Sequence, residues 1–189
     1  MESEFNLSPR VLLFVAGSLV LLIISRSSLH NPRVHGFYRF FGFEGVLALL
    51  LLNGAWGPTI SPPWLQLLGQ LLVACSILFA ALGYFQLRRH GGFHERLDVP
   101  ENFPFENTAH LVTDGIYRFI RHPMYSSLLL LAWAMLLRYP TLAGGTVLIP
   151  TTVCIVMAAR VEERENIGFF GERYREYMAR SRMFIPFIL

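Results

Sequence analysis

Five apolar segments follow one another along this 189-residue chain, and they restrict its possible folds more than any other feature. A helix needs about 17–25 apolar residues to cross a bilayer. The segments at about 37–56, 64–87 and 141–160 satisfy this length. Those at about 9–25 and 123–138 are shorter, but each starts at a proline, which is favoured in the first turn of a helix. The pattern predicts five transmembrane helices.

The composition supports a membrane protein. Hydrophobic residues make up 53% of the chain and charged residues 15%, whereas a soluble domain carries about 25% charged residues. We therefore expect an all-α, polytopic fold in which residues 1–189 form a single membrane domain. The two longest polar stretches are residues 88–122 and 161–189, which we expect to form a loop and a tail on one side of the membrane.

The basic residues are all arginines, and their distribution predicts the orientation of the chain. Arginines concentrate in the loops and tails that stay in the cytoplasm. If the N-terminus lies outside, only Arg10 and Arg138 fall on the outer side. We therefore expect the C-terminus and both long polar stretches to be cytoplasmic.

Two further structural features are expected near the C-terminus. Tyr139 and Pro140 end the fourth apolar segment, so a short turn leads into the fifth and the two should form a helical hairpin. The tail is rich in helix-forming residues and aromatics, which predicts an amphipathic helix at the membrane surface. We expect a break in this helix at Gly168 or Gly171.

The stretch "IRHPMY" leads into the fourth apolar segment. Pro123 should open the helix, which places His122 near its N-cap and Arg121 beside it. Free N–H groups and the helix dipole make such a position suitable for an anion. The alternative is interfacial anchoring by Arg, His and Tyr, which is common at the ends of membrane spans.

Glu162 and Glu163 lie at the end of the fifth apolar segment. Adjacent side chains project about 100° apart on a helix, so one carboxylate can face inward while the other faces solvent. Carboxylates are disfavoured at a helix C-terminus by the dipole, which indicates a role in binding a cation. The alternative is a solvated face in which the glutamates pair with Arg160 and Arg164.

Other polar residues give weaker indications. Glu44 lies within the second apolar segment, where it is either functional or paired with Arg39. His90 and His94 are separated by two glycines, so no metal site is predicted. Motifs for a Rossmann fold, a P-loop or a serine hydrolase do not occur in the sequence.

The C-terminal motifs together resemble a known family. Between His110 and Pro186 the chain contains "HLVTDGIYRFIRHPMY", then "EE", then "FFGERYREYMARSRMFIP". This combination resembles the isoprenylcysteine carboxyl methyltransferases and the wider group of integral membrane methyltransferases that includes phospholipid N-methyltransferases. The resemblance implies a methyltransferase that binds S-adenosylmethionine without a Rossmann fold, using the loop at 88–122.

The resemblance also implies specific site residues. It makes Arg180 and Glu163 the predicted catalytic residues, with Arg180 near the reacting end of the acceptor. Members of the family often have a histidine two residues before "LV", where this chain has Ala109, so the resemblance assigns no role to His110. The residues expected to bind the cofactor are Leu111, Val112, Gly115, Tyr117, Arg121, His122, Pro123, Tyr125, Glu162 and Glu163.

The predicted reaction follows from this site. The helix start at His122 suits the donor's carboxylate, and Glu162 or Glu163 suits its ammonium group. We expect methyl transfer to a lipophilic acceptor that enters from the bilayer, such as a prenylcysteine or another lipid carboxylate, held in line by Arg180. No metal and no nucleic-acid partner is expected.

Three alternatives stay open at this point. The acceptor could be a phospholipid amine or a thiol, which would need Glu162 or Glu163 as a base. A membrane reductase of the sterol type that uses NADPH shares "R-H-P-x-Y", but the serines after Tyr125 count against it. The third alternative is a membrane scaffold without enzymatic activity.

Overall fold

The computed structural model describes residues 8–52, 61–92 and 106–186. Within these ranges the chain is all-α, as predicted, and a single isolated β-bridge joins Ile120 to Arg182. Two short 3-10 turns, η1 (Ser28–His30) and η2 (Gly115–Arg118), accompany the α-helices. The helices of the described ranges are α1 (Pro9–Ser25), α2 (His35–Leu52), α3 (Pro63–His90), α4 (Pro123–Arg138), α5 (Leu142–Phe170) and α6 (Glu172–Arg180).

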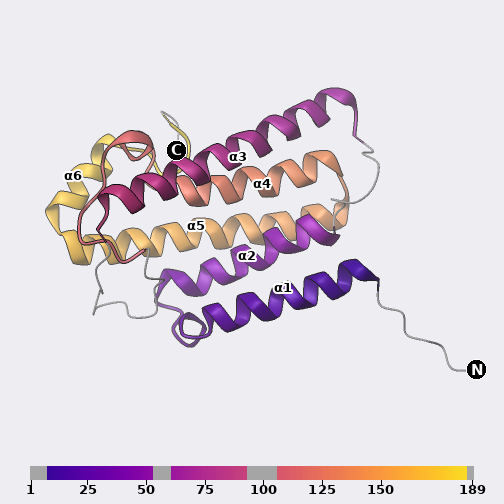
Figure 1. Cartoon of the computed structure of the whole chain (residues 1–189), viewed down its shortest axis with the longest axis horizontal. Helices are drawn as coiled ribbons and strands as arrows, with labels where there is room; N and C mark the ends of the chain where they lie inside the picture. Colours follow the sequence, from indigo (N-terminus) through magenta and orange to yellow (C-terminus); the bar gives the residue numbers. More distant parts are fainter. Residues whose placement is uncertain (1–7, 53–60, 93–105, 187–189) are drawn as a thin grey trace, which may run out of the picture.

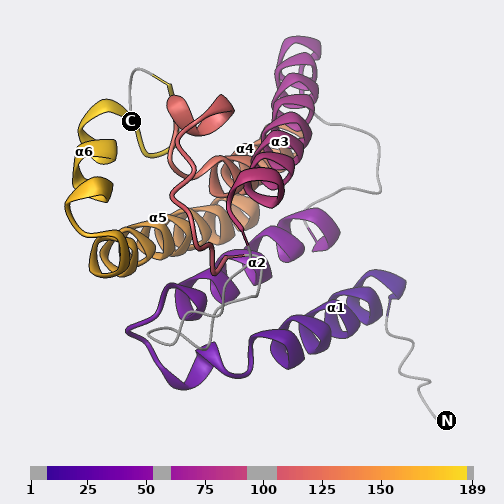
Figure 2. The ribbon, with the colours of Figure 1, turned by 60° about the vertical axis from the view of Figure 1, so that its left-hand side comes forward.

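The first five helices run side by side along the long axis of the molecule, and α6 lies at one end of them (Figure 1). The main packing contacts pair α2 with α5, α3 with α4, and α1 with α2. The segment that precedes α4 lies at the same end as α6 (Figure 2). This end of the bundle therefore brings together the loop and the tail, although they are far apart in sequence.

The helix boundaries agree with the sequence where prolines define them. α1 and α4 begin at Pro9 and Pro123 and end at the predicted residues. The expected hairpin follows, because α4 ends at Arg138 and α5 begins at Leu142. Thr141 caps α5 by accepting a hydrogen bond from the Gly144 N–H at 2.9 Å. Such a cap satisfies one of the N–H groups left free at a helix start.

The tail differs from the expectation. α5 continues without interruption to Phe170, so residues 161–170 extend this helix and are not part of a separate tail helix. The break lies at Gly171, which has φ of +63°, a left-handed conformation that favours glycine. Gly168 stays helical. The amphipathic helix is therefore only α6, which buries Tyr174 and Tyr177.

By length and composition, α3 and α5 are the described helices that could cross a bilayer, while α1 and α4 are shorter apolar helices. α3 exposes large apolar side chains, including Trp64, Ile77 and Phe85 at 65–66% exposure. Such a surface suits lipid better than water. The number of spans and the orientation stay predictions, and part of the predicted second span, residues 53–56, lies outside the described residues.

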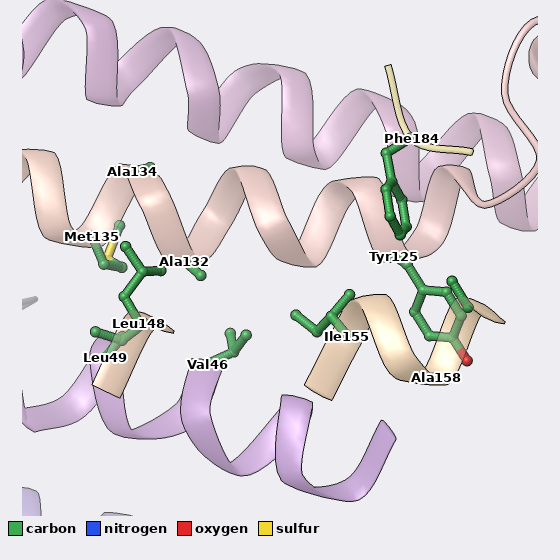
Figure 3. Close-up of a cluster of buried hydrophobic side chains, with 11 residues drawn as sticks. Val46, Leu49, Tyr125, Ala132, Ala134, Met135, Leu148, Ile155, Ala158 and Phe184 are labelled. Carbon is green, nitrogen blue, oxygen red and sulfur yellow. The ribbon is translucent and has the colours of Figure 1, made fainter. Parts of the chain in front are cut away.

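The hydrophobic core lies where α2, α4 and α5 meet (Figure 3). Val46 and Leu49 of α2 face Leu148 and Ile155 of α5 in this cluster. Tyr125 and Phe184 lie together at one end of it, so the residues after α6 take part in the same core. The core thus extends to the end of the bundle that holds the loop and the tail.

Gly45 allows α2 to approach α5 closely. A Cβ at this position would lie 1.9 Å from the Thr151 Oγ1 and 2.8 Å from its Cβ. Gly45→Ala is therefore expected to lower the free energy of unfolding by about 1–3 kcal/mol, because the helices must separate. Thermal unfolding in detergent measures this change.

Gly145→Ala is the matched control, because a Cβ at Gly145 meets nothing within 4 Å. Alanine is the better helix former, so this variant should unfold at the wild-type temperature or slightly above it. Equal unfolding temperatures for the two variants would show that α2 and α5 are not in close contact at Gly45.

Candidate active site

A cavity of about 300 Å³ lies at the end of the bundle that carries α6. Its walls come from α2 to α6 and from the segment before α4. The cavity gathers most of the predicted cofactor residues, namely Leu111, Val112, Tyr117, Arg121, His122, Pro123, Tyr125 and Glu162. Gly115 and Glu163 are not among the lining residues. The segment "LVTDGIY", the stretch "RHPMY" and Glu162 of the acidic pair therefore meet at one place in the fold.

Gly115 contributes through the backbone. It opens η2 with φ of +59°, and a Cβ there would lie 2.9 Å from the side-chain amide of Gln86. This turn places Tyr117, whose hydroxyl donates a hydrogen bond to the Gly83 carbonyl of α3 at 3.4 Å. Burial raises the pKa of Tyr117 above its ordinary value, so the phenol stays protonated.

Arg121 ties three elements together. Its Nε donates to Glu163 Oε1 of α5 at 2.6 Å, and its Nη1 donates to the carbonyls of Ser181 and Met178 at 2.6 and 3.3 Å. The Arg121 and Glu163 side chains are 9% and 8% exposed. These bonds commit both residues to holding α4, α5 and α6 in place.

Residues 182–184 pair with the backbone just before α4. The Arg182 N–H donates to the Phe119 carbonyl at 2.9 Å, and the Arg121 N–H donates to the Arg182 carbonyl at 2.8 Å. The His122 N–H donates to Met183 at 3.2 Å, and the Ser126 hydroxyl donates to Phe184 at 2.9 Å. We call this segment, residues 182–184, the C-terminal clip. It occupies the N–H groups of Arg121 and His122, which flank the helix start at which the sequence suggested anion binding.

The start of α4 and the acidic pair of α5 meet at His122. Its Nε2 lies 3.5 Å from Glu163 Oε1, and its Nδ1 lies 3.8 Å from Glu162 Oε1. The ring stacks on Tyr125, with centroids 5.6 Å apart. Glu162 lines the cavity with 26% of its side chain exposed, whereas Glu163 is held by Arg121. The two adjacent carboxylates therefore differ in environment, but both lie near His122, and neither faces solvent as one of them was expected to do.

A cluster of buried charges that the sequence did not reveal adjoins this cavity. The His35 Nδ1 lies 2.7 Å from Glu165 Oε2, and its Nε2 lies 3.4 Å from Glu106 Oε2. Glu106 also forms an ion pair with Arg39. Arg39 and Glu106 line the cavity. Of these four residues the sequence pointed only to Arg39, as a possible partner of Glu44. Glu106 and Glu165 occur in unremarkable polar sequence.

The charges of this cluster fix one another's protonation states. Burial alone would lower the pKa of His35, but Glu106 and Glu165 raise it from 6.5 to about 10. Burial alone would raise the pKa of Glu106, but His35 and Arg39 lower it from 4.5 to about 2. His35 is thus an imidazolium and Glu106 a carboxylate at neutral pH.

His35→Gln is expected to lower the unfolding temperature most between about pH 4.5 and 6.5. The His35 contribution is complete below pH 6.5 and is lost as the pH rises toward about 10. The Glu106 contribution is complete above pH 4.5 and is lost as the pH falls toward about 2. Thermal unfolding of the wild type and the variant from about pH 2 to pH 10 gives the difference between their unfolding temperatures, and a difference that stayed constant over this whole range would contradict the ion-pair assignment.

Arg180, the predicted acceptor-binding residue, does not line this cavity. It lies in a second hollow of about 550 Å³ together with Asp114, Arg118 and Phe119. Tyr177 lines both spaces. The catalytic role of Arg180 stays a prediction.

The two residues whose roles the sequence left open lie away from the cavity. Glu44 Oε2 accepts a hydrogen bond from the Ser18 hydroxyl at 2.7 Å, which joins α1 to α2. Its suggested partner Arg39 binds Glu106 instead. His110 is exposed and does not line the cavity. In the described ranges no group of three or more potential ligands could hold a metal ion.

Comparison with known proteins decides the family. A family model described as phospholipid methyltransferase matches residues 64–173, which is more than half of the chain. The chain belongs to this family. The match agrees with the resemblance of the C-terminal motifs, and it favours methyl transfer over the reductase and scaffold alternatives. The family consists of methyltransferases, which implies S-adenosylmethionine as the methyl donor, and together with the apolar helices it makes this a membrane protein.

Several curated relatives carry a more specific name. Methanethiol S-methyltransferase 1 of Bradyrhizobium diazoefficiens is 37% identical over 76 residues, 39% of this chain and 25% of the relative. Methanethiol S-methyltransferase of Crocosphaera subtropica is 27% identical over 157 residues, 75% of this chain and 58% of the relative. The chain thus spans about a quarter of the length of the first relative and little more than half the length of the second. No solved structure matches the chain significantly.

Proposed function

We propose that this chain transfers a methyl group from S-adenosylmethionine to the sulfur of a small thiol such as methanethiol. The relatives named above are methanethiol S-methyltransferases, which supports the thiol alternative over the lipid carboxylate. The observation that carries the proposal is the cavity, because it unites "R-H-P-x-Y", the preceding segment "LVTDGIY" and Glu162. S-adenosylmethionine supplies an electrophilic methyl group on a positively charged sulfur when it is bound.

The residues of the cavity fit such a donor. Tyr117 and Tyr174 present aromatic rings that attract a cationic sulfur. Glu162 adds a negative charge. The Tyr125 hydroxyl is buried beside the cavity without a hydrogen bond of standard geometry to the described residues, so a ligand can satisfy it. These features favour a ligand that carries positive charge and polar groups.

Glu162 is the proposed base. A thiol must lose its proton before its sulfur can attack, and Glu162 faces the cavity while Glu163 is occupied by Arg121. The thiol proton passes to the Glu162 carboxylate, and the thiolate sulfur forms the new bond to the methyl carbon. The bond between that carbon and the donor's sulfur breaks, and its electron pair stays on the donor's sulfur. The walls supply alignment and exclude water.

The size of the cavity favours a small acceptor. Its volume of about 300 Å³ lies at the lower end of ligand pockets, which range from about 300 to 1,000 Å³. With the donor in place, a one-carbon thiol fits better than a prenyl chain. Apolar residues such as Phe43 and Leu128 line part of the wall, which suits the methyl group of an apolar thiol. We place the cavity on the cytoplasmic side, following the arginine distribution.

The test offers three acceptors to the purified protein in detergent, with S-adenosylmethionine labelled in its methyl group. The acceptors are methanethiol, phosphatidylethanolamine and a farnesylcysteine carboxylate. We expect labelled dimethyl sulfide in the headspace and no label in the other two products. Label found only in the phospholipid or the prenylcysteine would overturn the thiol assignment, and no binding of the donor would overturn methyl transfer altogether.

A further inference from the structure

We propose that Arg39 and Glu106 bind the amino-acid end of the methyl donor, with its carboxylate on the guanidinium and its ammonium on the glutamate. This inference rests on the proposed function and extends the donor site to α2. Arg39 lies outside both the C-terminal motif segment and the residues matched by the family model. Glu106 precedes the stretch "HLVTDGIYRFIRHPMY", which begins at His110.

Several of the groups that the motif supplies for this task are already engaged. The backbone N–H groups of Arg121 and His122 donate to the C-terminal clip. The Arg121 guanidinium donates to Glu163 and to two carbonyls. A donor carboxylate that used the Arg121 guanidinium or these two N–H groups would have to displace these bonds, each of which contributes to stability. The sequence-based assignment of both charged ends to α4 and α5 therefore meets competition from the fold itself.

Arg39 and Glu106 provide the same chemistry within one ion pair that faces the cavity. Both line the cavity and form an ion pair with each other. A guanidinium has five N–H donors and a carboxylate has about four acceptor sites, so each can serve a ligand as well as its partner. A pair of opposite charges is complementary to a zwitterion, which an amino-acid end is.

The surrounding residues hold the pair in position. His35 lies between Glu106 and Glu165, and its backbone N–H donates to Glu165 Oε1 at 2.8 Å. Arg39 is 2% exposed, so its guanidinium has little freedom to turn away. Such preorganisation lowers the cost of ordering the site when a ligand binds. Glu162 is then left for the sulfonium and the acceptor.

The experiment compares two nucleosides by isothermal titration calorimetry. S-adenosylhomocysteine carries the amino-acid end, and 5′-methylthioadenosine lacks it. The wild-type protein should bind S-adenosylhomocysteine roughly 10- to 100-fold more tightly. In Arg39→Gln and Glu106→Gln this preference should fall to a few-fold, while the affinity for 5′-methylthioadenosine stays the same and shows that the variants are folded.

Glu165→Gln is the matched control, because Glu165 contacts His35 but does not line the cavity. It should bind both nucleosides with the wild-type ratio even if it unfolds at a lower temperature. Arg39→Lys replaces Arg39→Gln if the latter does not fold, since lysine keeps the charge but lacks the planar fork. A wild-type ratio in the Arg39 and Glu106 variants would overturn the inference alone, whereas no binding of either nucleoside to the wild-type protein would overturn the proposed function.

Discussion

Glu162→Gln is expected to lower the rate of methyl transfer to methanethiol by about 10²–10⁴-fold, because it removes the proposed base without changing the shape of the side chain. Glu162 faces the cavity and is 26% exposed, and its neighbour His122 keeps Glu163 at 3.5 Å after the substitution. Single-turnover measurement with labelled donor separates this step from binding. The loss should shrink at high pH, where the thiol ionises without help.

Two other substitutions test whether this effect is specific to the carboxylate in the cavity. Glu172→Gln removes an exposed carboxylate that pairs with Arg175 at 3.0 Å, and both rate and stability should stay unchanged. Glu163→Gln removes the buried partner of Arg121, so its main effect should be on the unfolding temperature. If Glu162→Gln transferred the methyl group at the wild-type rate, at neutral pH and saturating donor, Glu162 would not be the base.

Much of the fold follows from local sequence. Pro9 and Pro123 set two helix starts because their ring fixes φ and they lack the N–H that a first turn leaves unused. Tyr139 and Pro140, which end the fourth apolar segment, predict the hairpin of α4 and α5. The place of the helix break could not be decided between Gly168 and Gly171. Both glycines have open space around them, so what distinguishes Gly171 is its left-handed backbone, which the sequence does not specify.

The parts that could not be predicted depend on contacts between distant residues. Glu106 and Arg39 are 67 positions apart, and His35 and Glu165 are 130 apart. The periodicity of apolar residues does not predict ion pairs between residues so far apart. The sequence also does not distinguish a buried charged residue from an exposed one. The C-terminal clip could not be predicted for a similar reason. Hydrogen bonds between the backbones of residues 119–122 and 182–184 do not depend on particular residue types. The motifs predicted which residues lie around the cavity. They did not predict which of these residues, such as Arg121 and Glu163, hold the helices together and which face the cavity.

Arg121→Ala is expected to lower the free energy of unfolding by about 3–5 kcal/mol, because it leaves the Glu163 carboxylate buried without its partner. It also removes the donors to the Ser181 and Met178 carbonyls, which hold the end of α6. Chemical unfolding in detergent measures the change. Arg118→Ala, an exposed arginine on the neighbouring turn η2, is the control and should unfold as the wild type does.

The double variant Arg121→Ala with Glu163→Gln separates a structural role from an anion-binding role. If the pair is structural, removing both charges should be less destabilising than the two single effects added together, because no uncompensated buried charge remains. The preference for S-adenosylhomocysteine over 5′-methylthioadenosine should then survive in the double variant. If that preference vanished while the Arg39 and Glu106 variants kept it, the donor carboxylate would bind at the start of α4, and Arg121 would have to exchange Glu163 for the ligand.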